Sequence, residues 1–290
     1  MSIPANSECI LCHLRRHVQT ARGLGDDETA TAFAKALMRQ LLNAPEGTSS
    51  PALGPGANAL YQQFYGLEQD RYKAEKAESN RFVLARMDAI RSRVAAAPEP
   101  LYGALQFAIL GNYIDFSALQ EQVSYEKLDE MLDTAENIHV ERAVFDALCR
   151  DLEKGKKLLY LTDNAGEIGF DRIFAEELQK AYPHLRITFC VRGMPAHNDA
   201  TREDAEAVGV PFPVIDNGND VGGTELPLLS EEARQAMEEA DVILSKGQGN
   251  VETLYGCGYN IYYAFLVKCT RFVQVFHKPL MTPMLVRERS

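Results

Sequence analysis

Four short stretches of the sequence combine acids, amides, lysines and glycines, and each follows an apolar run. They are residues 163–167 (DNAGE), 192–199 (RGMPAHND), 245–250 (SKGQGN) and 268–269 (KC). Carboxylate and amide oxygens are ligands that hard divalent cations prefer, whereas lysines and backbone amides bind phosphate. If the fold brings these stretches together, they predict a site for a cation and a phosphorylated ligand.

The expected cation ligands are Asp163, Asn164 and Asp199. Carried by adjacent strands, they would turn two carboxylates and one carboxamide oxygen toward a common point. Such a set suits Mg²⁺ or Mn²⁺, which keep several waters and then accept phosphate oxygens. The alternative is that Asp163 and Asn164 form a turn after a strand while Asp199 caps a helix, and spacing alone does not decide between the two.

Lys246 and Lys268 each follow an apolar strand, so both ammonium groups are expected at the same rim of the sheet, where they would hold a phosphate in an otherwise acidic protein. Gly166, Gly247 and Gly249 allow close backbone approach, and the helices after them would add amide donors. The alternative is that the glycines are ordinary loop residues and the lysines are solvated. That alternative is weaker for Lys268, which lies among many apolar neighbours.

The second half of the chain must position these residues. Short apolar strands are predicted at residues 157–162, 186–191, 213–215, 241–244 and, as the last strand, 261–267. Helices are predicted between them at residues 168–182, 200–208 and 230–240, with Ser230 as an N-cap. This alternation predicts a parallel sheet covered on both faces, with the ligand beyond the carboxyl ends of the strands.

The first half is helical in period, with predicted helices at residues 29–42, 80–94, 100–107 with its continuation, and 125–154. A Pro/Gly/Ser-rich turn region separates the first two, at residues 45–56. The predicted fold class is therefore α/β: a three-layer α/β/α, mostly parallel sheet domain at residues 151–290, preceded by an all-helical domain at residues 1–150. The helical domain would form a wall of the substrate pocket.

Composition excludes several classes of partner. With 30 Lys+Arg against 41 Asp+Glu, the formal charge of −11 repels nucleic acid. The most apolar stretch, residues 101–114, is interrupted by polar residues and is shorter than the about 20 apolar residues of a membrane span. The N-terminus resembles no secretory signal, so a cytoplasmic protein with a small-molecule ligand is expected, and the six cysteines are interpreted as reduced thiols.

The N-terminal Cys9-Ile10-Leu11-Cys12-His13 matches the haem-attachment pattern, but no export signal precedes it. Cys9 and Cys12 could bind zinc with His13 or His17, although no second pair at finger spacing completes the site. They could equally be two packed thiols of the first helix. Dinucleotide, P-loop and serine-hydrolase motifs are missing from the sequence.

Taken together, these residues resemble the damage-control phosphatases, also called the DUF89 family, in the prokaryotic branch with an N-terminal cysteine pair. The resemblance covers nearly the whole chain. It includes the Cys9/Cys12 pair, residues 70–73 with Lys76 and Asn80, residues 111–115 (GNYID), the DNAGE stretch with Asp171, residues 198–201 (NDAT) with Asp204, Gly223-Thr224, residues 246–252 (KGQGNVE) and Lys268-Cys269. One departure is Arg71, which stands where the family usually has proline.

The resemblance implies a metal-dependent phosphatase acting on phosphomonoesters of small metabolites, such as sugar phosphates or damaged phosphometabolites. It places the divalent ion (Mg²⁺, Mn²⁺, Co²⁺ or Ni²⁺) on Asp163, Asn164 and Asp199, and it places phosphate contacts on Lys246 and Lys268. The other candidate phosphate- or substrate-binding residues are Gly166, Asn198, Gly247, Asn250, Asn112 and Asp115.

The metal and both lysines would neutralise the phosphoryl oxygens while a water or a carboxylate attacks in line. Glu167 is the candidate for orienting or deprotonating that water, and Asp163 as a nucleophile remains open. Two other functions share the strand-and-loop layout. One is an S-adenosylmethionine-dependent methyltransferase, although the usual glycine-rich first loop is missing. The other is a phospho-ligand binding module without turnover.

Overall fold

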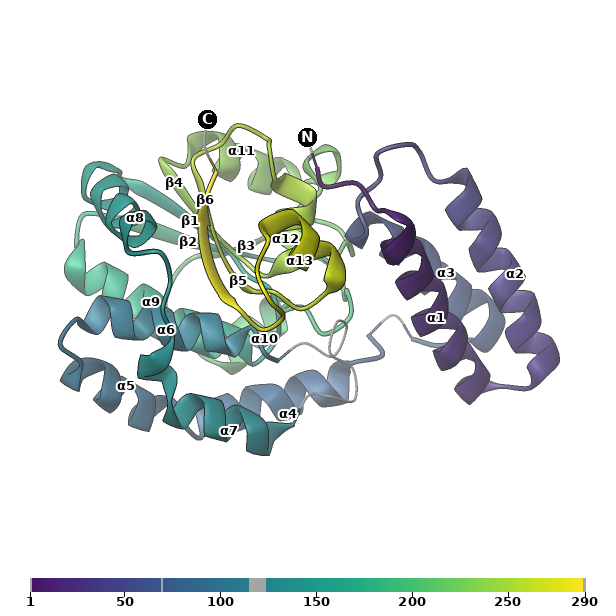
Figure 1. The fold of residues 1–290 in the computed structure, drawn as a ribbon, viewed down its shortest axis with the longest axis horizontal. Helices are drawn as coiled ribbons and strands as arrows, with labels where there is room; N and C mark the ends of the chain where they lie inside the picture. Colours follow the sequence, from purple (N-terminus) through teal and green to yellow (C-terminus); the bar gives the residue numbers. More distant parts are fainter. Residues whose placement is uncertain (1, 69, 115–123, 289–290) are drawn as a thin grey trace.

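A single mixed sheet lies at the centre of the molecule, in a computed structural model that describes residues 2–68, 70–114 and 124–288 (Figure 1). Its strands within these residues are β1 (Lys157–Leu161), β2 (Arg186–Val191), β3 (Val214–Asp216), β4 (Val242–Lys246), β5 (Ile261–Leu266) and β6 (Pro283–Arg287). Their order is β3-β2-β1-β4-β5-β6. The first five run parallel and β6 is antiparallel to β5. The predicted α/β class with a mostly parallel sheet is confirmed.

Two details of the predicted sheet are wrong. The strand at residues 261–267 is not the last, because β6 follows it as an antiparallel edge strand. This strand is short and begins with Pro283, so its sequence gives only a weak signal for a strand. Strand β4 also runs past the predicted residue 244, since Ser245 and Lys246 still pair with Tyr263 and Ala264 of β5. Lys246 thus belongs to the strand and not to the loop after it.

Five helices connect the strands of this half within the described chain. They are α9 (Glu167–Ala181), α10 (Arg202–Ala207), α11 (Glu231–Glu239), α12 (Gln248–Leu254) and α13 (Thr270–Phe276). The predicted cap of α11 is confirmed, because the Ser230 hydroxyl accepts the backbone N–H of Ala233 at 3.2 Å. Most of these helices begin close to the carboxyl end of a strand, which places their N-termini near the predicted site.

The first half contains eight α-helices in its described part. They are α1 (Ser7–Leu24), α2 (Asp27–Asn43), α3 (Gly54–Tyr65), α4 (Lys73–Leu84), α5 (Met87–Ala96), α6 (Pro100–Gly111), α7 (Tyr125–Asp133) and α8 (Arg142–Lys154). Among the described residues, no helix is long and apolar enough to cross a membrane. The predicted turn region at residues 45–56 is partly helical, since α3 begins inside it at Gly54.

Two predicted helices are each two helices in the structure. The segment 80–94 is divided between α4 and α5 at Arg86, whose guanidinium donates to the Phe82 carbonyl at 2.9 Å and so occupies an acceptor at the end of α4. The segment 125–154 is divided between α7 and α8, and Gln106 holds the intervening backbone by donating to the carbonyls of Glu136 and Ile138. A local contact therefore accompanies the first break, and a side chain distant in the sequence accompanies the second.

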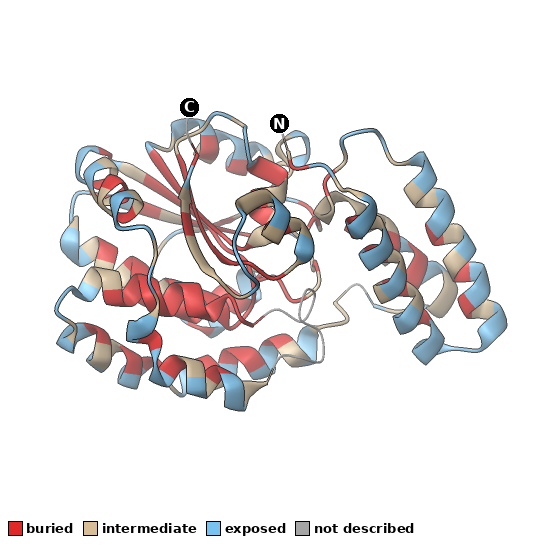
Figure 2. Cartoon of the chain, in the orientation of Figure 1, coloured by how far each residue is buried: buried red, intermediate tan, exposed pale blue. Residues whose placement is uncertain are grey.

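The helices of the first half pack in two groups. Helices α1–α3 enclose a separate small core around Phe33, Leu37 and Tyr61, whereas residues of α4–α8 share one core with the sheet and α9. Figure 1 shows α1–α3 to one side of the sheet, and Figure 2 shows α6 and the strands as the most buried elements. The predicted division at residue 150 stays a prediction.

The α6–α9 contact depends on a glycine. A Cβ added at Gly111 would lie 2.5 Å from Cδ2 of Phe170. We therefore expect Gly111→Ala to lower the free energy of unfolding by about 1 to 3 kcal/mol through overpacking, measured by urea titration. Gly23→Ala in α1, where the added Cβ meets nothing within 4 Å, is the control and should raise stability slightly. Equal stabilities of the two variants would contradict the packing argument.

Candidate functional site

The structure brings together the predicted cation ligands Asp163, Asn164 and Asp199. The loops after β1 and β2 form an isolated antiparallel bridge between Asn164 and Asp199, and the Ala200 N–H donates to the Asp163 carbonyl at 2.7 Å. All three side chains are largely buried. The cluster lies where the strand order reverses between β1 and β4, which is the place where parallel α/β sheets bind ligands.

Amide donors fix the orientation of Asp163 and Asn164. Asn112 Nδ2 and Asn164 Nδ2 donate to Asp163 Oδ2 at 2.9 and 2.8 Å, and Asn164 Nδ2 also donates to Glu167 Oε2 at 2.8 Å. Because the amide nitrogen of Asn164 is used by these carboxylates, its carbonyl oxygen is the atom that could bind a cation. Two carboxylates and one amide oxygen are chemically suited to a hard divalent ion.

The rest of the described chain offers no richer donor set. Among the described residues, no group of three or more His, Cys, Asp or Glu side chains is placed to hold a metal ion. A site here would therefore depend on the two carboxylates, the amide oxygen and water, which is typical of Mg²⁺ or Mn²⁺ and not of a structural zinc. The zinc alternative for Cys9 and Cys12 gains no support, and both are free cysteines in α1.

Gly247 makes the close approach between β4 and the Asp163 carboxylate possible. Its φ of +78° lies in the left-handed region, and a Cβ added there would lie 1.9 Å from Asp163 Oδ2. Any larger residue must therefore push the Asp163 side chain out of its position. This contact couples the loop after β4 to the loop after β1.

We expect Gly247→Ala to weaken Mn²⁺ binding at least tenfold, because the added methyl group displaces a predicted ligand. Isothermal titration calorimetry on the whole chain measures this change. Gly47→Ala is the matched control, since Gly47 has a similar φ of +83° but an added Cβ there meets nothing within 4 Å. The same loss of affinity in both variants would assign the effect to backbone strain and not to Asp163.

Lys246 does not emerge at the rim of the sheet as predicted. Its ammonium is fully buried and donates to the Ala108 carbonyl at 2.8 Å, to Glu167 Oε1 at 2.7 Å and to Asp171 Oδ1 at 2.6 Å. The physical reason is that β4 extends to Lys246, so the pleat of the strand turns the side chain toward the helices. An ammonium has three N–H donors, and all three are used here.

The charges around Lys246 are coupled. Burial alone lowers the pKa of Lys246, but the attraction of Asp171 and then of Glu167 outweighs it and raises the pKa, so the lysine stays charged. Burial, opposed by Lys246, raises the pKa of Asp171 to about 7, and the Tyr160 hydroxyl donates to Asp171 Oδ1 at 2.8 Å. The Lys246 ammonium therefore forms ion pairs with two buried carboxyl groups, those of Glu167 and Asp171.

Glu167 is enclosed by donors. It is fully buried and accepts hydrogen bonds from Lys246, from Asn112 Nδ2 at 3.0 and 3.1 Å, and from Asn164 Nδ2. Its proposed catalytic role stays a prediction. By accepting these hydrogen bonds, Glu167 orients the side-chain amides of Asn164 and Asn112.

Arg192 is a site residue to which the sequence analysis gave no role, although it begins the polar stretch at residues 192–199. The side chain comes from the end of β2, is 2% exposed, and donates through Nε to Asp199 Oδ2 at 2.6 Å. Its Nη2 lies 3.3 Å from Asn250 Oδ1 and 3.9 Å from Asp163 Oδ1. A basic residue directly after a buried strand, seven positions before Asp199 in an acidic chain, was the available signal.

The other predicted site residues have varied placements. Asn250 Nδ2 donates to the carbonyls of Thr162 and Lys246 at 3.0 and 2.7 Å, which fixes the loop after β4. Asn198 Nδ2 donates to the Ile114 carbonyl at 3.2 Å. Lys268 follows β5 at the same end of the sheet and is 6% exposed. Asp115 lies outside the described residues.

Helix α4 ties the two ligand-bearing loops together. Lys76 Nζ lies 2.9 Å from Asp204 Oδ2, and Asn80 Nδ2 donates to Asp204 Oδ1 at 2.9 Å. Asn80 Oδ1 also accepts the Gly166 N–H at 2.7 Å, so this amide is engaged inside the protein. Asp204 in turn accepts the Thr201 backbone N–H in a capping box shortly after Asp199.

A histidine cluster lies beside the site, on helix α1. The rings of His13 and His17 are 4.3 Å apart, and His17 Nδ1 lies 3.1 Å from the Tyr61 hydroxyl. Burial, and after it the charge of Arg16, lowers the pKa of His13 to about 4. His13 is therefore protonated at a lower pH in the folded chain than in the unfolded chain.

The depressed pKa of His13 predicts a loss of stability on acidification. Below the ordinary pKa of 6.5 the unfolded chain binds a proton that the folded chain refuses until about pH 4, so stability falls across this window. We expect His13→Gln to reduce the stability lost between pH 6.5 and pH 5 by about 2 kcal/mol, measured by urea titration. The exposed His184→Gln is the control, and equal pH slopes in both variants would contradict the prediction.

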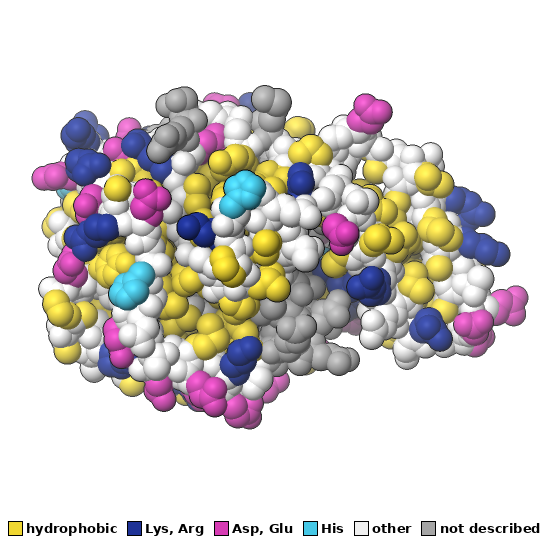
Figure 3. Space-filling view, viewed as in Figure 1, with side chains coloured by type: hydrophobic (Ala, Val, Ile, Leu, Met, Phe, Trp, Pro, Cys, Tyr) yellow, Lys and Arg dark blue, Asp and Glu magenta, His cyan; other side chains and the backbone are white. Residues whose placement is uncertain are grey.

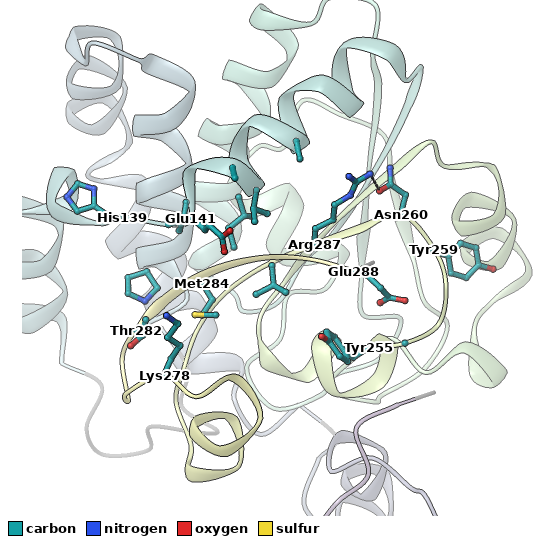
Figure 4. A pocket seen from close by; sticks show the side chains of 18 of the residues that line it. His139, Glu141, Tyr255, Tyr259, Asn260, Lys278, Thr282, Met284, Arg287 and Glu288 are labelled. Carbon is teal, nitrogen blue, oxygen red and sulfur yellow. Dashed lines mark hydrogen bonds between the residues drawn. The ribbon is translucent and has the colours of Figure 1, made fainter. Parts of the chain in front are cut away.

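A large cavity lined by described residues lies away from this site. Its volume is about 1150 Å³, and it runs along β6 and the start of α8 (Figure 4). Its charged lining is mixed, with Glu141 and Glu288 beside Lys278 and Arg287. Hydrophobic side chains gather over the middle of the face drawn in Figure 3. None of the predicted site residues lines this cavity, so the chemistry at the strand ends gives the better candidate site.

The fold and the polar cluster define a three-layer α/β protein with an acid–amide site beyond its parallel strands. The model of the damage-control phosphatase ARMT1-like domain matches residues 5–281, so the chain belongs to this family. The further placement in the branch with an N-terminal cysteine pair stays a prediction.

Relatives agree with this membership. An uncharacterized protein of Methanocaldococcus jannaschii is 33% identical over 278 residues, covering 92% of this chain and 90% of that protein. A damage-control phosphatase of Archaeoglobus fulgidus is 30% identical, with 85% of each chain covered. The crystal structure of a DUF89 family protein from Pyrococcus horikoshii matches over 100% of both chains, with a TM-score of 0.85 and 26% identity. Family and relatives support a phosphatase role in general.

Proposed function

We propose that the chain is a metal-dependent phosphatase that hydrolyses phosphomonoesters of small metabolites, such as sugar phosphates or damaged phosphometabolites. The observation that carries this proposal is the convergence of Asp163, Asn164 and Asp199 at the point where the strand order reverses. Lys268, from the end of β5, is at the same end of the sheet. An acidic protein needs such local positive charge to attract a phosphate ester.

Asp163, Asn164 and Asp199 would hold a divalent ion, with Mg²⁺, Mn²⁺, Co²⁺ and Ni²⁺ as the candidates. When bound, the ion would polarise the phosphoryl oxygens and activate a water molecule. The chain's part is to keep the ligands fixed before substrate arrives. Asn112 and Asn164 do this by donating to Asp163 Oδ2, and Arg192 does it by donating to Asp199.

The nucleophile is either a water or the Asp163 carboxylate. As a nucleophile, Asp163 would form an aspartyl phosphate that water then hydrolyses. Acid-quenched chain after incubation with a phosphorylated substrate would carry this intermediate, whereas a water mechanism leaves no phosphate on the protein. The buried position of Glu167 favours a role in orienting Asn164.

The two other functions have less support. A methyltransferase is not favoured by the relatives, two of which are named damage-control phosphatases. It would bind S-adenosylmethionine saturably even after chelation of metal. A binding module without turnover would be stabilised by phosphorylated ligands and would release no phosphate.

We expect Asp163→Ala and Asp199→Ala each to lower metal-stimulated hydrolysis of an aryl phosphate at least a thousandfold, because each removes a charged ligand. The assay follows phosphate release with each of the four divalent ions and with EDTA. Asp146→Ala, which removes an exposed partner of Arg142, is the control and should keep full activity.

Circular dichroism must show that both variants remain folded. Turnover that survives in both, or wild-type turnover that is indifferent to EDTA, would overturn the metal assignment. A panel of sugar phosphates assayed in the same way would then rank the substrates.

A further inference from the structure

Arg192 presents an unused pair of donors at the candidate site. Its Nε and Nη2 are engaged by Asp199 and Asn250, but Nη1 makes no hydrogen bond within the described residues. The Arg192 side chain is only 2% exposed. The Nη1 end of the guanidinium is therefore the part with N–H groups left to donate to a bound anion.

The surroundings of Arg192 hold it rigidly. Asn250 Oδ1, which accepts from Nη2, also accepts the Thr224 hydroxyl at 2.8 Å, and Asn250 Nδ2 is bound to two backbone carbonyls. The guanidinium is planar and always charged, so fixing two of its nitrogens also fixes the third. Such a preorganised charged donor costs little reorganisation when an anion binds.

The charge balance of the site also favours an anion-binding role for the Arg192 guanidinium. The charges of Asp163 and Asp199 neutralise a divalent ion. The ion and these two ligands together therefore carry no net positive charge to neutralise a phosphate dianion. The ammonium of Lys246 has its three donors in use on Ala108, Glu167 and Asp171, so it has none left for a phosphate. Arg192 adds a positive charge at this end of the sheet, where Lys268 also lies.

We propose that Arg192, and not Lys246, is a phosphate-binding catalytic residue, whose Nη1 donates to a phosphoryl oxygen while its Nε holds Asp199. This inference rests on the proposed phosphatase function. It assigns to Lys246 the separate task of fixing Glu167 beneath the site. Arg192 thereby connects a ligand of the metal to the bound ester.

The first test measures binding of inorganic phosphate to the whole chain with Mn²⁺ present, by calorimetry. We expect Arg192→Gln to raise the phosphate dissociation constant about ten- to a hundredfold, the usual effect of losing a charge-assisted hydrogen bond. The titration is made at saturating Mn²⁺, so that any loss of the Nε contact to Asp199 does not limit phosphate binding. Arg202→Gln, which removes an exposed partner of Asp216, is the matched control and should leave the phosphate dissociation constant unchanged.

A second test separates contact from a merely structural role. In Arg192→Ala, added guanidinium should restore phosphate affinity and turnover, whereas urea, which has a similar shape but no charge, should not. A structural defect would respond to neither. Phosphate affinity that is unchanged in Arg192→Gln, or rescue by urea as effective as rescue by guanidinium, would overturn the proposal.

Should the variants fail to fold, the wild-type chain still provides a test. In crystals grown with Mn²⁺ and orthovanadate, Nη1 of Arg192 is expected within about 3.5 Å of an oxyanion oxygen. An oxyanion bound with Nη1 out of hydrogen-bond reach overturns the assignment. Wild-type chain that binds phosphate through Arg192 but hydrolyses no ester would instead remove the phosphatase function, so the two failures are distinguishable.

Discussion

The geometry of the site depends on one buried ammonium group, that of Lys246, between two carboxylates. Removing such charges from water is costly, and the cost is met only because Glu167, Asp171 and a backbone carbonyl use all three donors. Losing one partner of a buried pair typically costs about 3 to 5 kcal/mol. The interaction joins β4 to the first turns of α9, and Glu167 passes this constraint on to the amides that orient Asp163.

A second constraint acts from the other side. Helix α4 reaches both ligand-bearing loops, because Asn80 binds Gly166 after β1 and Asp204 after β2. The two loops are therefore held at once by the sheet, by α9 and by α4. A cation that binds only a few protein ligands does not by itself hold flexible side chains in place. Such a site therefore needs surrounding hydrogen bonds that orient the ligands. This explains why so many buried polar groups surround so small a donor set.

The strand ends could be predicted because hydrophobic runs and the polar residues after them lie close together in the sequence. The placement of Lys246 could not, since extending β4 by two residues changes which way a side chain points, and only pairing with β5 decides that extension. Arg192 received no role because the contact that holds its Nη2 comes from Asn250, far along the chain. Likewise Gln106 holds the backbone between α7 and α8 from 30 residues away, a contact that no local period contains. Pairing and distant partners therefore set the limit of sequence reasoning.

The net charge of −11 makes the local arrangement of positive charge decisive. Two lysines after two strands would satisfy a phosphate dianion on paper, but burying one of them in the scaffold removes it from the ligand. On the proposed assignment, its place is taken by a guanidinium at the end of β2, which Asp199 already aligns. An arginine suits this position better than a lysine, because it can hold a carboxylate with one nitrogen and keep another for an anion. On the proposed assignment, the same side chain thus positions a cation ligand and receives the ester.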